Sequence, residues 1–159
     1  MKKIFLALVI LLFLSGCVMR IAEVPPRIYS LESAVQIPSG KYKLIHLESV
    51  SGYENIELKG MVAVYRGPDG SMYLFYGFKS FDDAPKKVWK SIVKKYGVWN
   101  LGVYIDLPSV GYYSVEKKDK HVVAWWKDVW LFVVESKANP RDFVKDVMDA
   151  FARLGGMLR

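Results

Sequence analysis

The segment of residues 122–135 constrains the fold of this chain more than any other. It contains two β-rich runs, residues 122–126 and 129–135, separated only by Lys127 and Asp128, and such a short connection predicts an antiparallel hairpin. The connection sets the register, so we expect three cross-strand pairs: Trp126 with Val129, Trp125 with Trp130, and Val123 with Phe132. Both faces of this hairpin are then apolar, whereas a hairpin with one face in water alternates apolar and polar residues. The sheet must therefore be covered on both faces.

The rest of the chain supplies five more strands and two helices. The expected strands are residues 42–50, 59–65, 71–78, 101–106 and 111–117, and the helices follow Asp83 and Asn139. Short connections between strands are compatible only with an antiparallel sheet. We therefore predict an α+β fold, an antiparallel β-sheet with helices packed on it, forming a single α/β/α sandwich domain over residues 41–159.

Capping residues set the expected helix ends. Asp82 or Asp83 caps the first helix, Pro85 suits its first turn, and Gly97 closes it. The inward face of this helix repeats at helical spacing and comprises Val88, Trp89, Ile92, Val93 and Tyr96. The second helix has Asn139 as its cap and Pro140 in its first turn, and we expect Gly155-Gly156 to end it.

The stretch from His121 to the helix at Asn139-Pro140, together with the preceding hairpin and lysine-rich helix, resembles the PsbP/Mog-like α/β/α sandwich. It is similar to a small group of thermophile lipoproteins of unknown function with that fold. PsbP proteins are extrinsic, membrane-associated subunits of the oxygen-evolving complex, and Mog-type proteins bind the GTPase Ran and release its nucleotide. No functional residue of either family matches a numbered position here, so the resemblance implies a fold but no site.

The amino terminus predicts export. Lys2 and Lys3 precede eleven apolar residues, too few to cross a bilayer, and this pattern is typical of a signal peptide. The following Leu14-Ser15-Gly16-Cys17 resembles the lipobox of bacterial lipoproteins. In that family the cysteine sulfur receives a diacylglycerol, the signal is removed before it, and the new amino terminus is usually acylated. The alternatives are a plain secretory signal with an incidental cysteine and an uncleaved signal anchor.

The lipobox implies a division of the chain and a location. Residues 1–16 are the signal peptide, Cys17 is the lipidated first residue, and residues 17–40 form a lipid-anchored tether with one short element around residues 28–35. Two or more acyl chains suffice for stable anchoring. We therefore expect a lipid-anchored protein of the cell envelope, on the extracytoplasmic side of the membrane.

The charge of the mature chain narrows the possible partners. Without residues 1–16 it carries 21 basic and 16 acidic residues, a net charge of +5. This excess favours an anionic lipid surface or an acidic protein partner, and it is far below a nucleic-acid-binding signature. Few amides and many charged residues are typical of a thermophilic source; the mature amides are Gln36, Asn55, Asn100 and Asn139.

No pattern in the sequence predicts catalysis. His46 and His121 lie on predicted strands without the spacing of metal ligands, so we expect no metal and no cofactor. There is no Gly-x-Ser-x-Gly elbow, and residues 67–70 form a turn rather than a phosphate loop. Asp82-Asp83 is explained by helix capping. We therefore do not expect an enzyme, although a polar cleft holding His46 or His121 beside a carboxylate would favour one.

Five lysines on the first predicted helix form the surface that we expect to contact the membrane or a partner: Lys86, Lys87, Lys90, Lys94 and Lys95. A solvated helix face whose charges pair with acidic residues elsewhere would show the same pattern. No acidic residue occurs between Lys86 and Lys95, however, and unpaired lysines near an anionic leaflet gain about 1 kcal/mol each. We expect this face to rest on headgroups or to bind an acidic partner.

The five tryptophans leave two interpretations open: Trp89, Trp99, Trp125, Trp126 and Trp130. Each can pack in the core, or two of them can line an apolar pocket for a lipid or another apolar ligand. The sequence thus predicts a non-catalytic envelope lipoprotein that is a binding or accessory module for a membrane-associated protein. A lipid or hydrophobic-ligand binder is the first alternative, and a regulator of a GTP-binding protein, by analogy with Mog-type proteins, is the second.

Overall fold

The computed structural model describes residues 21–38, 40–98 and 102–157. Its elements follow the predicted order, with one short helix before the first strand. They are α2 (Leu31–Val35), β1 (Lys43–Tyr53), β2 (Ile56–Arg66), β3 (Met72–Lys79), α3 (Ala84–Tyr96), β4 (Val103–Leu107), β5 (Val110–Lys117), β6 (Lys120–Lys127), β7 (Trp130–Ser136) and α4 (Arg141–Met157).

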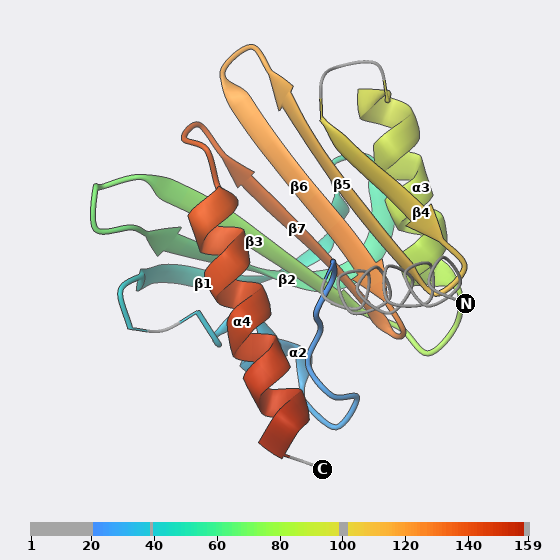
Figure 1. Ribbon diagram of the computed structural model, residues 1–159, viewed down its shortest axis with the longest axis horizontal. Helices are drawn as coiled ribbons and strands as arrows, with labels where there is room; N and C mark the ends of the chain where they lie inside the picture. Colours follow the sequence, from blue (N-terminus) through green and yellow to red (C-terminus); the bar gives the residue numbers. More distant parts are fainter. Residues whose placement is uncertain (1–20, 39, 99–101, 158–159) are drawn as a thin grey trace, which may run out of the picture.

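The seven strands form one antiparallel sheet in the order β1-β2-β3-β7-β6-β5-β4. Figure 1 shows α4 and α2 over one face of this sheet and α3 behind the other. The predicted α+β fold, an antiparallel sheet with helices packed on it, is confirmed.

The sheet separates two hydrophobic cores, one covered by α4 and the other by α3. On the α4 face, Phe143 and Phe151 of the helix pack with Trp125 and Phe132 of the sheet. On the α3 face, the side chains of Trp89 and Ile92 pack with residues of β6 and β7 that include Trp126, Leu131 and Val133. Strands β6 and β7 contribute buried apolar residues to both cores, which confirms that the aromatic hairpin is covered on both faces.

The register of β6 and β7 differs from the predicted one by two residues. Trp125 lies opposite Phe132, and Lys127 lies opposite Trp130, so the turn consists of Asp128 and Val129. Asp128 has a φ of 56°, a left-handed conformation that Asp tolerates better than most residues. Because a shift of two preserves the alternation of side chains, the predicted faces hold, except that Val129 packs in the α4-side core.

Residues 21–38, which the sequence placed in the tether, lie against the sheet. Ala22, Ala34 and Val35 are buried in the α4-side core. The indole nitrogen of Trp125 donates to the carbonyl of Glu23 at 3.1 Å, and the Tyr65 hydroxyl donates to the carbonyl of Val35 at 2.7 Å. The packed part of the chain therefore begins before residue 41.

The starts of α3 and α4 agree with the predicted caps, but the end of α4 does not agree with its predicted position. Asp83 occupies the cap position of α3, and the Asp82 carboxylate accepts a hydrogen bond from the Ala84 backbone at 2.9 Å. The Asn139 side chain accepts one from the Arg141 backbone at 3.0 Å at the start of α4. The predicted stop at Gly155-Gly156 is wrong, because α4 continues through both glycines to Met157.

Candidate functional site

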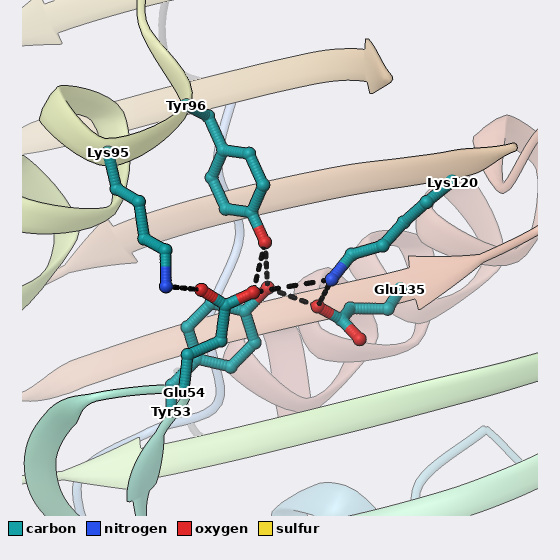
Figure 2. A network of polar contacts seen from close by, with 6 residues as sticks. All are labelled: Tyr53, Glu54, Lys95, Tyr96, Lys120 and Glu135. Carbon is teal, nitrogen blue, oxygen red and sulfur yellow. Dashed lines mark hydrogen bonds and ion pairs between the residues drawn. The ribbon is translucent and has the colours of Figure 1, made fainter. Parts of the chain in front are cut away.

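Six polar side chains from four parts of the chain meet on the α3 face of the sheet, where the tip of the β1–β2 hairpin reaches the helix (Figure 2). We call this cluster the tip network. It consists of Tyr53, Glu54, Lys95, Tyr96, Lys120 and Glu135. The hairpin tip, the end of α3, the start of β6 and the end of β7 each supply at least one member.

Glu54 and Glu135 are the two centres of the tip network. Glu54 accepts a hydrogen bond from the Tyr96 hydroxyl and forms ion pairs with Lys95 and Lys120, the latter at 3.3 Å. Glu135 accepts a hydrogen bond from the Tyr53 hydroxyl and pairs with Lys120 at 2.6 Å. Lys120 therefore joins the two carboxylates, and the two tyrosine hydroxyls lie 3.3 Å apart.

Close backbone contacts position the hairpin tip. The register of β1 and β2 shifts between Val50 and Gly52, and a Cβ on Gly52 would lie 2.1 Å from the carbonyl oxygen of Ile56. A Cβ on Gly60 would lie 2.3 Å from the ring of Phe78. Gly52 allows the β1–β2 hairpin to bulge, and Gly60 allows β2 to approach Phe78 of β3 closely. The tip then packs through Tyr53 in the α3-side core.

Burial and hydrogen bonding shift the pKa values of Tyr53, Glu54 and Lys120 in the tip network. Burial acts to raise the pKa of Glu54, but hydrogen bonds from Lys95, Tyr96 and Lys120 outweigh it and lower that pKa. Burial, together with the neighbouring carboxylate of Glu135, raises the pKa of the Tyr53 hydroxyl far above its usual value. Burial acts to lower the pKa of Lys120, but its contact with Glu135 and other neighbours raises it. Both tyrosine hydroxyls are therefore donors, Tyr53 to Glu135 and Tyr96 to Glu54.

This arrangement is suited to holding elements together. Both glutamates are occupied by donors from within the tip network, and the tyrosine most deeply buried there keeps its proton. A general base needs a carboxylate or imidazole free to accept a substrate proton. The tip network therefore fastens the hairpin tip to α3 and β7.

Residues 51–58 lie between two predicted strands and match no predicted element, so the tip network does not follow from the sequence patterns. A signal was present: Glu54-Asn55 lies between two β-rich runs, and Asn is favoured in two-residue hairpin turns. Glu54 adopts a φ of 52° in this turn. No pattern in the sequence, however, pairs the turn with Tyr96, Lys120 or Glu135.

A cavity of about 630 Å³ lies beside the tip network. Lys120 and Glu135 line it together with the apolar side chains of Met72, Leu74 and Ala138. It is the feature of the described residues that best fits the hydrophobic-ligand alternative. Its walls contain no tryptophan.

The predicted lysine surface lies on α3, but three of its five members have acidic partners from outside the run. Lys87 pairs with Asp83 at 2.8 Å, Lys90 with Asp106 at 3.6 Å, and Lys95 with Glu54. Lys86 donates to the carbonyl of Pro108 at 3.3 Å and lies over the ring of Trp126. Lys94 is exposed, and within the described residues no acidic side chain comes within 4.0 Å of its ammonium. Counting acidic residues along the helix alone overstated the unpaired charge.

The two histidines lie on strands, as predicted. His46 and Glu48 are 3.2 Å apart on the exposed side of edge strand β1. His121 lines a cavity of about 300 Å³ with Glu116 and Arg141, but its Nε2 is 4.0 Å from the Glu116 carboxylate, which is too far for a hydrogen bond. Across residues 21–38, 40–98 and 102–157, no group of three or more His, Cys, Asp or Glu side chains could hold a metal ion.

Four of the five tryptophans pack in the core. Trp89, Trp125 and Trp130 are fully buried and Trp126 nearly so, which supports the core interpretation over a tryptophan-lined pocket. Trp99 lies outside the described residues. So does Cys17, the predicted lipidation site.

Comparisons with known proteins identify the amino-terminal motif and the family of the chain. Residues 1–17 match the prokaryotic membrane lipoprotein lipid attachment site, which confirms a lipoprotein anchored by lipid at the cell envelope. None of the helices in the described part of the chain is long and apolar enough to span a membrane. Residues 26–154 match the family described as "Protein of unknown function (DUF3242)".

One solved structure is similar over most of the chain. The crystal structure of a GTP binding regulator from Thermotoga maritima superposes with a TM-score of 0.73 at 32% sequence identity, covering 80% of this chain and 91% of that one. No curated protein sequence matches the chain significantly.

Proposed function

Because the chain belongs to the DUF3242 family of proteins of unknown function and carries a lipoprotein attachment site, we propose that it is a non-catalytic binding module on the extracytoplasmic side of the membrane. Its partner is a membrane-associated protein with an acidic surface. The observation that carries this proposal is the row of exposed lysines on α3, presented by a domain that a lipid holds at the membrane.

The organisation of the polar groups supports a binding role. The carboxylates of the tip network are bound to lysines and tyrosines of the same chain. The His46–Glu48 pair lies on an exposed strand, and His121 makes no hydrogen bond to its carboxylate neighbour. Neither histidine is held as a general base in a catalytic pair would be.

The lysine face is concentrated on one side of α3. The opposite side of this helix packs in the core through Val88, Trp89, Ile92 and Val93, so its lysines point to solvent. Lys87 and Lys90 form ion pairs that remain partly exposed, and such pairs contribute little to stability. The carboxylates of an acidic partner can replace Asp83 and Asp106 as the counter-ions of these lysines at small cost in free energy. Within the described part of the chain, Lys94 has no acidic neighbour and is available to the partner directly.

Two alternatives have specific support. The cavity beside the tip network, with Met72 and Leu74 in its wall, fits the binding of a small hydrophobic ligand. The related Thermotoga maritima protein is a GTP binding regulator, which favours control of a GTP-binding protein. Both alternatives are compatible with a non-catalytic protein.

Site-specific photo-crosslinking in native membranes tests the proposal. A photoreactive residue at position 94 of the full lipoprotein is expected to capture one membrane-associated protein with an acidic surface. The same residue at Lys145, on the exposed side of α4, is the control and is expected to capture none. Equal capture from the two positions would contradict a docking surface on α3.

Charge variants separate a protein partner from lipid. In protein that carries the photoreactive residue at position 94, Lys87→Gln with Lys90→Gln is expected to abolish the crosslink, whereas Lys43→Gln with Lys59→Gln, which removes the same charge from β1 and β2, leaves it intact. If the α3 variant instead lost only affinity for phosphatidylglycerol vesicles and kept the crosslink, the acidic partner would be the lipid surface and the proposal would be wrong. Adding GTP or a fatty acid to the same assay tests the alternatives.

A further inference from the structure

One end of the sheet gathers the first described residues of the chain. The carbonyl of Glu23 is bound to the Trp125 indole, and Arg27 donates to Asp128 in the β6–β7 turn at 2.6 Å. Lys79, at the end of β3, donates to the carbonyl of Arg27 at 2.6 Å. We call this region the anchor end; it comprises residues 23–29, residues 79–81 and the β6–β7 turn.

The anchor end exposes two large apolar side chains. Ile28 is 77% exposed and Phe81 is 74% exposed. They are neighbours of the same ammonium group, because Lys79 donates to the carbonyls of Arg27 and Tyr29, on either side of Ile28, and lies 5.4 Å from the centre of the Phe81 ring. Exposed apolar side chains rimmed by polar and basic groups are one form that a membrane-contacting surface takes.

The length of chain between the lipid and the anchor end limits how far this end can be from the membrane. The attachment-site match ends at residue 17, and the described structure begins at Ile21. Four residues span at most about 14 Å when fully extended. Two residues after Ile21, Glu23 is already held against the sheet by Trp125. A lipid at Cys17 therefore keeps the anchor end close to the bilayer surface.

We propose that the anchor end rests on the bilayer with Ile28 and Phe81 inserted at the interface between headgroups and acyl chains. This proposal rests on lipid anchoring and is independent of a protein partner. The basic side chains of Arg27, Lys79 and Lys127 then lie at the level of the headgroups. Insertion rather than charge drives the contact, because Glu23, Asp82, Asp83 and Asp128 at the same end offset the basic residues.

This orientation places the lysine face at a defined height. α3 begins three residues after Phe81 and runs toward the tip network, where Lys95 meets Glu54. Because a helix rises 1.5 Å per residue, Lys94 lies about 15 Å further along the axis than Ala84. With the anchor end on the bilayer, the second half of α3 therefore lies further from the membrane surface than the first half.

Fluorophore labelling of the full lipoprotein in vesicles tests this orientation. Cys17 is the only cysteine of the chain, so in the lipidated protein a thiol introduced elsewhere is the only free one. An environment-sensitive dye is attached to each of three variants: Ile28→Cys, Phe81→Cys and, as the control, Glu116→Cys. Glu116 lies at the opposite end of the sheet and its side chain is 70% exposed. The proteins are reconstituted in phosphatidylcholine vesicles with and without phosphatidylglycerol, and brominated lipids are the quencher.

The expected result is a blue shift and quenching by brominated lipid at positions 28 and 81, in both kinds of vesicle, and neither effect at position 116. Equal quenching at all three positions, or none at 28 and 81 in protein that still floats with the vesicles, overturns the proposal. Such a result would leave the crosslink from position 94 unaffected, so the two proposals fail independently.

A second variant tests the role of the apolar side chains themselves. In protein labelled at position 116, Ile28→Ser with Phe81→Ser is expected to increase energy transfer from the label to a headgroup acceptor, because the domain no longer keeps one end on the bilayer. Val98→Ser, which changes an exposed apolar residue just after α3, is the matched control and leaves the transfer unchanged. Unchanged transfer in the double variant would contradict the proposal.

Discussion

The hydroxyl of Tyr53 donates a hydrogen bond to the carboxylate of Glu135, a residue 82 positions further along the chain. The contact joins the tip of an edge hairpin to β7, which lies in the middle of the sheet. Lys120 binds the same carboxylate oxygen from the neighbouring strand. The hairpin tip is thereby fixed to the core on the face that carries α3.

Tyr53→Phe removes this hydrogen bond and keeps the ring in the core. We expect the free energy of unfolding to fall by about 1–3 kcal/mol, because the partly buried carboxylate of Glu135 then loses one of its donors. Urea unfolding of the purified lipoprotein, followed by circular dichroism, measures the change. Tyr104→Phe is the control, since Tyr104 is exposed and bonds Asp106 at 3.3 Å; a loss as large as that of Tyr53→Phe would show that the tip network has no special role.

Stability should decrease in acid partly through Glu54. Its pKa in the folded protein lies below the ordinary value of 4.5 because three donors bind its charged form and outweigh burial. Ionised Glu54 therefore stabilises the fold above pH 4.5, and this contribution is lost as the pH falls through the lowered pKa. Glu54→Gln should be less stable than the wild type at pH 7 and lose less stability between neutral and acid pH. Parallel stability profiles of the two proteins would contradict this prediction.

Gly60→Ala should destabilise the protein through steric overlap. The added Cβ would lie 2.3 Å from the Phe78 ring and 2.5 Å from the Gly77 carbonyl oxygen, and overpacking of this kind costs about 1–3 kcal/mol. Gly155→Ala in α4 meets no atom within 4 Å and should leave the thermal midpoint unchanged or slightly higher. A thermal midpoint equal to the wild type in Gly60→Ala would show that β2 and β3 can separate without cost.

Trp125→Phe should release the segment that leads to the lipid anchor. It removes the indole that binds the Glu23 carbonyl at 3.1 Å while leaving an aromatic ring against Phe132. We expect faster hydrogen exchange in residues 23–28. Trp126→Phe is a matched control, because the indole nitrogen of Trp126 is buried without a hydrogen-bond partner in the described residues. Equal exchange in the two variants would mean that the hydrogen bond does not hold the segment.

The fold was predictable to the extent that it follows from local pattern. The apolar residues on both faces of residues 122–135 predicted a sheet covered on both sides, and both cores exist. The predicted register was wrong because the length of the connection between the two strands does not specify which two residues form the turn. Asp128 and Val129 form it, with Asp128 in the left-handed conformation.

The packed segment at residues 21–38 illustrates a second limit. Its apolar residues lack helical or strand periodicity, and Pro25 and Pro26 make it resemble a linker. Single contacts hold it instead, such as those of Glu23 with Trp125 and Val35 with Tyr65. Contacts between residues far apart in sequence leave no local pattern.

The same limit applies to the candidate sites. The lysine face was visible as a helical run, but its partners Glu54 and Asp106 come from other elements. The tip network depends on a hairpin bulge at Gly52 that brings Tyr53 to Glu135. Lipid attachment, in contrast, depends on a short contiguous motif that ends on Cys17, and so it could be predicted.

Mass spectrometry of the mature protein purified from membranes tests whether a lipid anchors the chain at Cys17. We expect an amino-terminal peptide that begins at Cys17 and carries the mass of a diacylglycerol on its sulfur, with the protein recovered in the membrane fraction. An unmodified Cys17 thiol in protein recovered from the aqueous fraction would contradict lipid anchoring.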